Sequence, residues 1–428
     1  MKESFYNFEF ENNGKYLIYN SISGGVIELN KSEYDIFKNQ LNEPENKDFK
    51  NSLYEQGIVV ENNIDEKDRF MSLLKLSKYS MDQVSIVIAP YLGCNFSCVY
   101  CYEKGNMNNH KISIETLNKI YEYIDYLSDN SKKLYIAWTG GEPLMAYNEV
   151  LYLSGKIYEL CRTKKVDYNG YIVTNGSLLN KTIAKSLSNV GVNSVQITID
   201  GLEETHNKNR PFNSGEGSFA TIIENIKSVY DDFERIDIRV NIDKSHESDI
   251  MELKDIFKEF DRENKIKIYI SKIENVNNVK YNDRVYSNEE FKELQLNSVK
   301  KGDFNLLNLI FPDTKIRYCM ADSIFEIIIG PDGEIYKCWS DIGMKGRIVG
   351  NINQFITYTN QEFIGYNNFM VWEEEKCGGC KFLPICMGGC PRERYEKRET
   401  SCQYDEKYLE QLIVEFHNAK EENYVSKI

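Results

Sequence analysis

Apolar residues in the middle of the chain recur in short blocks, and polar segments with apolar positions at helical spacing separate these blocks. The blocks that read as buried strands are residues 84–90, 134–140, 170–175, 194–200, 237–243 and 266–273. Runs such as 113–128 and 219–233 lie between them and have helical periodicity. The alternation predicts right-handed βαβ crossovers and a parallel sheet, either an open barrel or a doubly wound sheet. In both folds the chemistry collects at the carboxyl ends of the strands.

The flanking stretches have other patterns. Near the N-terminus, residues 5–10, 15–20 and 24–29 predict short strands, and 31–41 and 68–79 predict helices. After about residue 316 come short strands with turns, a loop dense in cysteine and a terminal helix. That helix has Leu409, Leu412, Ile413 and Phe416 on one face. We therefore predict three domains, at residues 1–82, 83–315 and 316–428.

Composition narrows the class of protein. The 428 residues are 41% hydrophobic and 28% charged, which is ordinary for a globular protein. The 52 basic and 66 acidic residues give a net charge of −14, which argues against general binding to nucleic-acid phosphates. We find no apolar run of about eighteen residues and no signal-peptide pattern. The sequence predicts a cytoplasmic protein with neither a nucleic-acid nor a membrane partner.

The chain has eleven cysteines and four histidines. A reducing cytosol opposes a disulfide framework, and no histidine lies at a metal-ligand spacing from another. We therefore expect metal or cluster sites with sulfur ligands. Three of the cysteines, Cys94, Cys98 and Cys101, directly follow the first buried strand. A closed zinc site needs four ligands, whereas three thiolates on a cubane iron–sulfur cluster leave one iron open.

Seven further cysteines lie near the C-terminus and include the run Cys-x2-Cys-x5-Cys-x3-Cys. They are Cys319, Cys338, Cys377, Cys380, Cys386, Cys390 and Cys402. Paired Cys-x2-Cys units alone fit structural zinc as well as iron–sulfur. Seven ligands exceed one four-ligand site and fall one short of two.

Together these patterns resemble a known family. Cys-x3-Cys-x2-Cys after the first strand is similar to the radical S-adenosylmethionine (SAM) superfamily, and the C-terminal pattern, with Gly333, is similar to its SPASM extension. The resemblance covers about residues 83–410. It implies a partial (β/α)6 TIM-like barrel with a C-terminal cysteine-rich SPASM domain. It also implies three [4Fe–4S] clusters, one of which binds SAM through its open iron. A reductant such as flavodoxin or ferredoxin would drive cleavage of SAM to a 5′-deoxyadenosyl radical.

The resemblance also implies SAM contacts. In "GGEP", Gly140, Gly141 and Glu142 match the motif that approaches the amino group of SAM, and the backbone of Tyr100 matches the adenine contact. Positions that contact ribose or carboxylate are matched by Asn175, Thr198 and Arg210. An arginine suits a carboxylate because its fork donates two parallel hydrogen bonds. Each of these residues alone also has a plain structural interpretation.

By matching positions, the resemblance implies ligands for two auxiliary clusters. The outer cluster would take Cys377, Cys380, Cys386 and Cys402, and the inner one Cys319, Cys338 and Cys390. Fully ligated relatives have one more upstream cysteine, which this chain lacks; Cys161 reads as a buried free thiol. The inner cluster then binds either a substrate thiolate or an oxygen ligand at its open iron.

The first 82 residues resemble the winged-helix-like α+β module that recognises leader peptides in ribosomal peptide maturation. In that module the leader adds a strand to a sheet edge. Residues 1–82 hold 10 basic and 15 acidic residues, a net of −5, which argues against DNA binding. A domain that only caps the barrel is the alternative.

We therefore predict a radical SAM enzyme that modifies a ribosomally made precursor peptide, most readily by forming a thioether between cysteine and a carbon atom. Epimerisation and carbon–carbon crosslinking fit the same scaffold. A second enzyme hypothesis is an anaerobic sulfatase-maturating enzyme, which forms formylglycine; the missing inner-cluster cysteine counts against it. A non-catalytic iron–sulfur electron-transfer protein is the hypothesis from another class, and it would release no 5′-deoxyadenosine from SAM.

Overall fold

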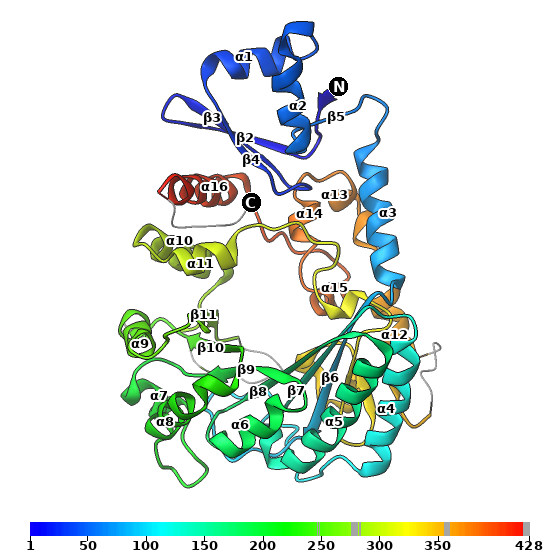
Figure 1. Cartoon of the computed structure of the whole chain (residues 1–428), viewed down its shortest axis with the longest axis vertical. Helices are drawn as coiled ribbons and strands as arrows, with labels where there is room; N and C mark the ends of the chain where they lie inside the picture. Colours follow the sequence, from blue (N-terminus) through cyan, green and yellow to red (C-terminus); the bar gives the residue numbers. More distant parts are fainter. Residues whose placement is uncertain (246, 248, 275–280, 282–283, 355–359, 423–428) are drawn as a thin grey trace. The chain divides into compact units, whose positions relative to one another are not determined.

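The computed structural model describes residues 1–245, 247, 249–274, 281, 284–354 and 360–422 (Figure 1). The chain forms two compact units from discontinuous segments. Unit 1 contains Met1–Tyr79, Lys292–Ser323 and Tyr366–Ile428, and unit 2 contains Ser80–Phe291 and Ile324–Gly365. These two units are defined by compactness and are discontinuous in the sequence, whereas the three domains predicted above are contiguous. The bounds of those domains stay a prediction.

Unit 2 is built on six parallel strands that coincide with the six predicted ones. They are β6 (Gln83–Tyr91), β7 (Lys133–Gly140), β8 (Asp167–Thr174), β9 (Val192–Thr198), β10 (Arg235–Ile242) and β11 (Ile266–Lys272). They lie side by side in chain order, and each neighbouring pair is parallel. Helices connect them: α4 (Ile114–Ser128), α5 (Tyr147–Lys164), α6 (Lys181–Ser188), α7 (Glu203–Asn209), α8 (Phe219–Val229) and α9 (Asp249–Lys258). Among the described residues β6 and β11 do not pair, so the α/β sheet is an open, partial (β/α)6 barrel.

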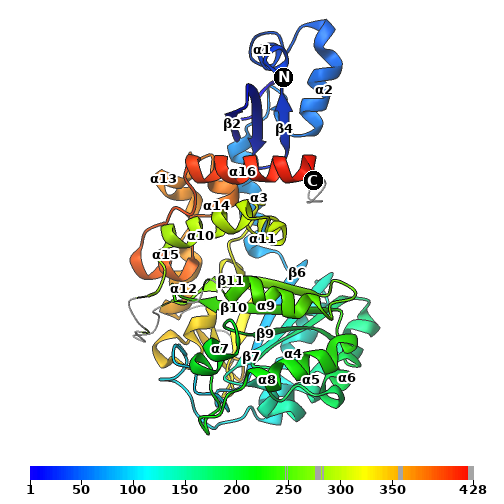
Figure 2. The ribbon, with the colours of Figure 1, turned by 90° about the vertical axis from the view of Figure 1, so that its left-hand side faces the viewer.

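Alternation along the strands separates the helix-covered face of this sheet from its inner face. In β10, Ile236, Ile238, Val240 and Ile242 are all buried. The residues between them are polar, and of these Arg239 and Asn241 line a cavity on the inner face. Successive side chains of a strand point to opposite faces, so one strand packs against helices and still presents polar groups inside. Figure 2 shows this sheet from a second side, with helices along its outer face.

The C-terminal strands of unit 2 extend the same sheet. β12 (Ile327–Ile329) pairs in parallel with β6, and β13 (Glu334–Tyr336) and β14 (Gly350–Asn351) follow as antiparallel neighbours. The turn between β12 and β13 contains Gly333 at φ +81°, a left-handed conformation that favours glycine. Cys338 and Trp339 lie just after β13, on a segment that the extended sheet fixes.

Unit 1 begins with a three-stranded antiparallel sheet in the order β2-β3-β4. Its elements near the N-terminus are β1 (Lys2–Glu3), β2 (Asn7–Asn12), β3 (Lys15–Asn20), β4 (Val26–Leu29), α1 (Lys31–Asn39), α2 (Lys47–Glu55), β5 (Val59–Val60) and α3 (Glu66–Tyr79). Helix α1 starts with a capping box, because the Asn30 side chain accepts from the Glu33 N–H and the Glu33 carboxylate accepts from the Asn30 N–H. The predicted order of strands followed by helices is confirmed.

The cysteine-rich segment packs against this N-terminal sheet within unit 1. Lys381 donates to the backbone oxygen of Asn7 at 3.0 Å, and the rings of Phe8 and Phe382 lie 4.6 Å apart. The later helices are α10 (Asn288–Lys300), α11 (Phe304–Ile310), α12 (Gln361–Asn368), α13 (Glu375–Gly378), α14 (Leu383–Cys386), α15 (Pro391–Lys397) and α16 (Glu406–Glu421). The apolar face predicted for the terminal helix is confirmed, because its four residues on α16 are fully buried.

Candidate active site

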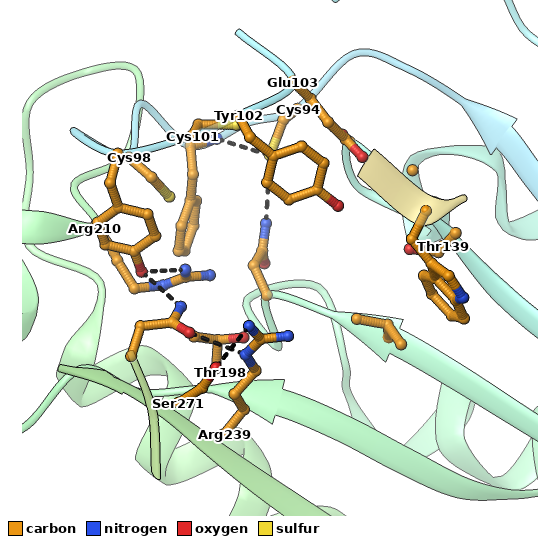
Figure 3. Close-up of a pocket in the computed structure, with 18 of the residues that line it drawn as sticks. Cys94, Cys98, Cys101, Tyr102, Glu103, Thr139, Thr198, Arg210, Arg239 and Ser271 are labelled. Atoms are coloured by element: carbon orange, nitrogen blue, oxygen red, sulfur yellow. Dashed lines mark hydrogen bonds between the residues drawn. The ribbon is translucent and has the colours of Figure 1, made fainter. Parts of the chain in front are cut away.

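A cavity of about 410 Å³ opens at the carboxyl ends of the parallel strands of unit 2 (Figure 3). The three N-terminal cysteines form one wall, and polar residues from β9, β10 and β11 lie across from them. The predicted site residues on its lining are Cys94, Cys98, Cys101, Tyr100, Gly140, Gly141, Asn175, Thr198 and Arg210. The structure therefore brings together in one place residues that are more than a hundred positions apart in the sequence.

The cysteine loop that follows β6 is held by the end of α7 and the segment after it. The Ser97 N–H donates to the Pro211 oxygen at 2.9 Å, and the Val99 N–H donates to the Asn209 oxygen at 3.0 Å. The rings of Phe96 and Phe212 add an edge-to-face contact with centroids 4.9 Å apart. These contacts fix the loop, so the positions of its cysteines are set by the barrel.

The chemistry of the three thiols fits a cluster. Burial raises the pKa of Cys94 to about 12 and the pKa of Cys101 to about 11, a setting in which thiolates form when a cation binds them. Among the described residues, no three His, Cys, Asp or Glu side chains converge closely enough to hold a single metal ion. A cubane needs no such convergence, because each thiolate binds a different iron. The ligand assignment stays a prediction.

The "GGEP" turn packs directly on the cysteine loop. Gly140 has φ +109°, and a Cβ on Gly141 would lie 2.3 Å from the Gly93 oxygen. The backbone N–H groups of Gly141 and Glu142 donate to the oxygens of Tyr91 and Gly93 at 3.1 and 3.0 Å. Both glycines are therefore required for close backbone contact, and both also line the cavity.

Glu142 is fully buried and does not line the cavity. Its carboxylate accepts hydrogen bonds from the Leu144 N–H at 2.9 Å, the Thr174 hydroxyl at 2.7 Å and the Asn175 N–H at 2.8 Å. These bonds tie the end of β7 to the end of β8. The geometry makes Glu142 a residue that positions the wall of the site.

Asn175 directly follows β8, and Thr198 is the last residue of β9. Both residues line the cavity. The Asn175 amide donates to the Asn95 side-chain oxygen at 2.8 Å, while its own oxygen accepts from Ser177. Asn175 is thus bonded to the cysteine loop. Thr198 is mostly buried, and its hydroxyl-bearing side chain faces the cavity (Figure 3).

Tyr100 has a larger role than a backbone contact alone. Its phenol oxygen accepts hydrogen bonds from the Arg210 guanidinium at 2.9 Å and from the Asn241 amide at 3.1 Å, and its hydroxyl donates to Asp200. From the sequence, only the backbone of Tyr100 was expected to contact SAM. The structure places it at the centre of a buried network between the cysteine loop and the barrel.

Arg210 ends α7, is 8% exposed and retains a buried Nε–H with no hydrogen-bond partner in the described structure. Behind it, the Ser218 hydroxyl donates to the Arg210 oxygen at 2.7 Å, and Ser218 in turn contacts His206 Nε2 at 3.0 Å. His206 Nδ1 accepts from the Asp200 N–H at 3.2 Å, which makes the ring neutral with its proton on Nε2. Burial and the Arg210 charge hold the pKa of His206 well below its usual value. The Nε–H of Arg210 is a buried donor that these contacts hold in place, so it suits an anionic ligand group.

Sequence reasoning missed Arg239, Asn241 and Ser271 on β10 and β11. All three line the cavity. The available signal was the alternation in "DIRVNID", where polar residues occupy every second position of an otherwise apolar strand. Glu103, two residues after Cys101, also lines the cavity, and burial raises its pKa to about 7.

The C-terminal cysteines are distributed over both units. Cys377, Cys380, Cys386 and Cys402, the predicted outer set, all belong to unit 1, where Cys319 and Cys390 also lie; Cys338 belongs to unit 2. In unit 1 the Cys377 thiol donates to Thr400 Oγ1 at 3.5 Å and the Cys386 thiol to the Ser401 oxygen at 3.9 Å. The first and last cysteines of the "CGGCKFLPIC" run thus contact the same short segment, which directly precedes Cys402. Cys161 is buried on α5, as predicted.

Residues 88–257 match the model of the Radical SAM superfamily. The matched segment includes the cysteine loop, the "GGEP" turn and Arg210. The chain contains a radical SAM domain. Within the described residues no helix is long and apolar enough to cross a bilayer.

Curated relatives of this chain include maturases. A cysteine-type anaerobic sulfatase-maturating enzyme of Clostridium perfringens is 24% identical over 357 residues, which cover 76% of this chain and 93% of the relative. The radical SAM cyclopropyl synthase TigE of Paramaledivibacter caminithermalis is 21% identical, and the match covers 89% of this chain and 87% of that enzyme. An uncharacterised protein of Methanocaldococcus jannaschii is 34% identical over 139 residues, and the match spans 32% of this chain and 44% of that protein.

Solved structures share the fold. Native anSMEcpe with bound AdoMet and Cp18Cys peptide superposes with a TM-score of 0.58 at 21% identity, over 80% of this chain and 98% of that one. SuiB of Streptococcus suis bound to precursor peptide SuiA gives 0.56 at 16% identity, over 95% of this chain and 99% of that one. At these identities the likeness shows the fold alone.

Proposed function

We propose that this radical SAM protein modifies a ribosomally made precursor peptide, most readily by joining a cysteine sulfur to a carbon atom. The observation that carries the proposal is the cavity at the strand ends. It contains three partly buried thiols on one wall and, beside them, the buried Nε–H of Arg210 that has no partner among the described residues.

Four residues of the wall have proposed tasks. Cys94, Cys98 and Cys101 would hold the [4Fe–4S] cluster, and Arg210 would donate to the carboxylate of SAM. When bound, the reduced cluster and SAM supply a 5′-deoxyadenosyl radical that abstracts hydrogen from the substrate. The partly enclosed cavity would shield that radical from bulk water, and the glycine turn would let a ligand approach the backbone because it has no side chains there.

The peptide substrate is supported by structures with the same fold that hold peptides, anSMEcpe and SuiB. In unit 1, β2 and β4 are the outer strands of the N-terminal sheet. We propose that a leader peptide pairs with one of these edges, because unpaired backbone groups bind an extended chain.

The auxiliary clusters belong to the proposal as well. Cys377, Cys380, Cys386 and Cys402 would hold the outer cluster, and Cys319, Cys338 and Cys390 the inner one. An open inner iron would bind the substrate thiolate, or else an oxygen ligand. A low-potential donor such as flavodoxin or ferredoxin in the cytoplasm would supply the electron.

Formylglycine formation is the second candidate function. It is favoured by the sulfatase-maturating relative, which covers 76% of this chain. Both reactions consume a cysteine thiol of the substrate, but their products differ. A thioether loses two hydrogen atoms and keeps the sulfur, whereas formylglycine replaces the sulfur by an aldehyde oxygen.

The test is anaerobic reconstitution followed by counting of iron and 5′-deoxyadenosine. We expect about twelve irons per chain, falling to about eight in a Cys94/Cys98/Cys101→Ala variant that makes no 5′-deoxyadenosine. Mass spectrometry of a cysteine-containing precursor peptide then separates thioether from formylglycine. Zinc in the C-terminal loop with four irons or fewer would contradict the auxiliary clusters, and unchanged peptide mass would contradict the maturase proposal.

A further inference from the structure

We infer that Arg239 forms a subsite for a substrate carboxylate on the inner face of the barrel, opposite the cysteine wall. The ligand is the side chain of an aspartate or glutamate near the residue that loses hydrogen. The inference rests on the proposed peptide function and adds a sequence preference to it.

The guanidinium of Arg239 is fixed along one side. Its Nε–H donates to the Asn241 side-chain oxygen at 2.9 Å, and its NH2 group donates to the Ser271 hydroxyl at 2.9 Å. Both acceptors are neutral and come from β10 and β11. An arginine has five N–H donors. The end formed by its two terminal nitrogens therefore retains donors for a ligand, and this end faces the cavity (Figure 3).

The charge of Arg239 has no anionic partner in the described structure. Neither Glu103 nor Glu274, the acidic side chains on the lining, comes within 4.0 Å of it. Glu274 pairs instead with Lys272 at 3.4 Å. The contrast on the same strand is Arg235, whose Nε donates to Asp237 at 2.8 Å. A cation that lines a partly enclosed cavity without a counter-ion favours binding of an anion there.

A carboxylate matches this donor geometry better than other ligand groups. The planar fork of arginine binds the two carboxylate oxygens through parallel hydrogen bonds. SAM is the other possible source of a carboxylate, but Arg210 provides a separate buried donor on the side of the cysteine loop. Two arginines on different walls fit two carboxylates, one from each reactant.

The test uses reconstituted enzyme with SAM bound. A library of short peptides, capped at both ends and randomised around a fixed central cysteine, is equilibrated with the immobilised enzyme, and the retained peptides are sequenced. We expect wild type to enrich Asp and Glu about tenfold at one position relative to the cysteine, as expected of a charge-assisted pair. Arg239→Gln should abolish the preference, and Arg239→Glu should reverse it toward Lys and Arg. Arg235→Gln is the matched control and should behave as wild type, and all variants should keep the Kd for SAM.

Each contrary outcome has a distinct meaning. Weaker SAM binding in Arg239→Gln with unchanged peptide preference would assign the arginine to SAM and overturn the subsite. Retained peptides without acidic preference in wild type would overturn it while leaving the peptide function intact. Retention of no peptide by wild type would remove the peptide function and the subsite with it. If Arg239→Glu fails to incorporate clusters, the comparison of Arg239→Gln with wild type decides the test.

Discussion

The phenol oxygen of Tyr100 accepts a hydrogen bond from the Arg210 guanidinium at 2.9 Å. Tyr100 lies between two predicted cluster ligands, and Arg210 ends a helix 110 residues later. This contact joins the loop that would hold the cluster to the donor that would hold SAM. Movement of either group is therefore transmitted to the other, and substitutions on one side should alter binding on the other.

Replacing Tyr100 with phenylalanine tests this connection. The change keeps the ring and removes a bond to a charged group, so the Kd for SAM should rise about tenfold with unchanged iron content. Equilibrium dialysis with reconstituted enzyme measures it. Tyr171→Phe is the control: it removes a tyrosine hydroxyl that donates to the Gln196 side chain on the same inner face. This variant should keep the wild-type affinity for SAM. Equal SAM affinity in Tyr100→Phe would show that Arg210 is held by other contacts.

Gly141→Ala should prevent assembly of the SAM cluster. The added Cβ would lie 2.3 Å from the Gly93 oxygen and 2.6 Å from the Leu92 oxygen, both backbone atoms, so the cysteine loop must move. We expect about four fewer irons per chain after reconstitution. Gly105→Ala is the matched control, because its Cβ would meet no atom within 4 Å. A full iron count in Gly141→Ala would mean that the "GGEP" turn and the cysteine loop move apart without loss of the cluster.

His206 should make the protein sensitive to mild acid. Burial holds its pKa below the usual value, so the folded state keeps the ring neutral while the unfolded chain takes up a proton below about pH 6.5. The unfolded state then binds more protons, and stability falls as the pH decreases through that value. Relative to His206→Gln, wild type should lose about 1 kcal/mol of stability between about pH 7.5 and about pH 5.5. Thermal unfolding at both pH values measures it, and parallel changes in the two proteins would contradict the assignment.

Cys386→Ala should separate the two kinds of cluster. It removes one proposed ligand of the outer cluster in unit 1, so about four irons should be lost. Production of 5′-deoxyadenosine should continue, because the radical SAM cavity lies in unit 2. The matched control is Cys161→Ala, which removes a buried thiol of α5 and should leave the iron count unchanged. Loss of 5′-deoxyadenosine in Cys386→Ala would make the outer cluster part of SAM cleavage.

The fold of unit 2 was predictable because its strands are short, strongly apolar and regularly spaced. All six were placed within a few residues from sequence alone. The discontinuous units were not predictable, since they depend on pairing between distant segments. The contact of Lys381 with Asn7 and the pairing of β12 with β6 are of this kind. Local periodicity contains no information about which distant edges meet.

The candidate site was predictable where spacing carried the signal. Cys94, Cys98, Cys101 and Arg210 all line the cavity. Glu142 is fully buried and lies outside the cavity lining, and its predicted contact with SAM stays a prediction. Arg239 was missed, because a lone arginine within a strand reads as a solvated side chain until the sheet curves around it.

The pairing of β12 with β6 also bears on how this protein can be divided. Ile327, Ile328 and Ile329 lie beside Ile86, Val87 and Ile88, and all are buried. A fragment limited to residues 83–315, the central domain predicted from the sequence, would leave this side of β6 as a bare hydrophobic edge, a common starting point for aggregation. Unit 2 is thus completed by residues that come after this central segment in the sequence, and residues 83–315 alone do not contain the whole of it.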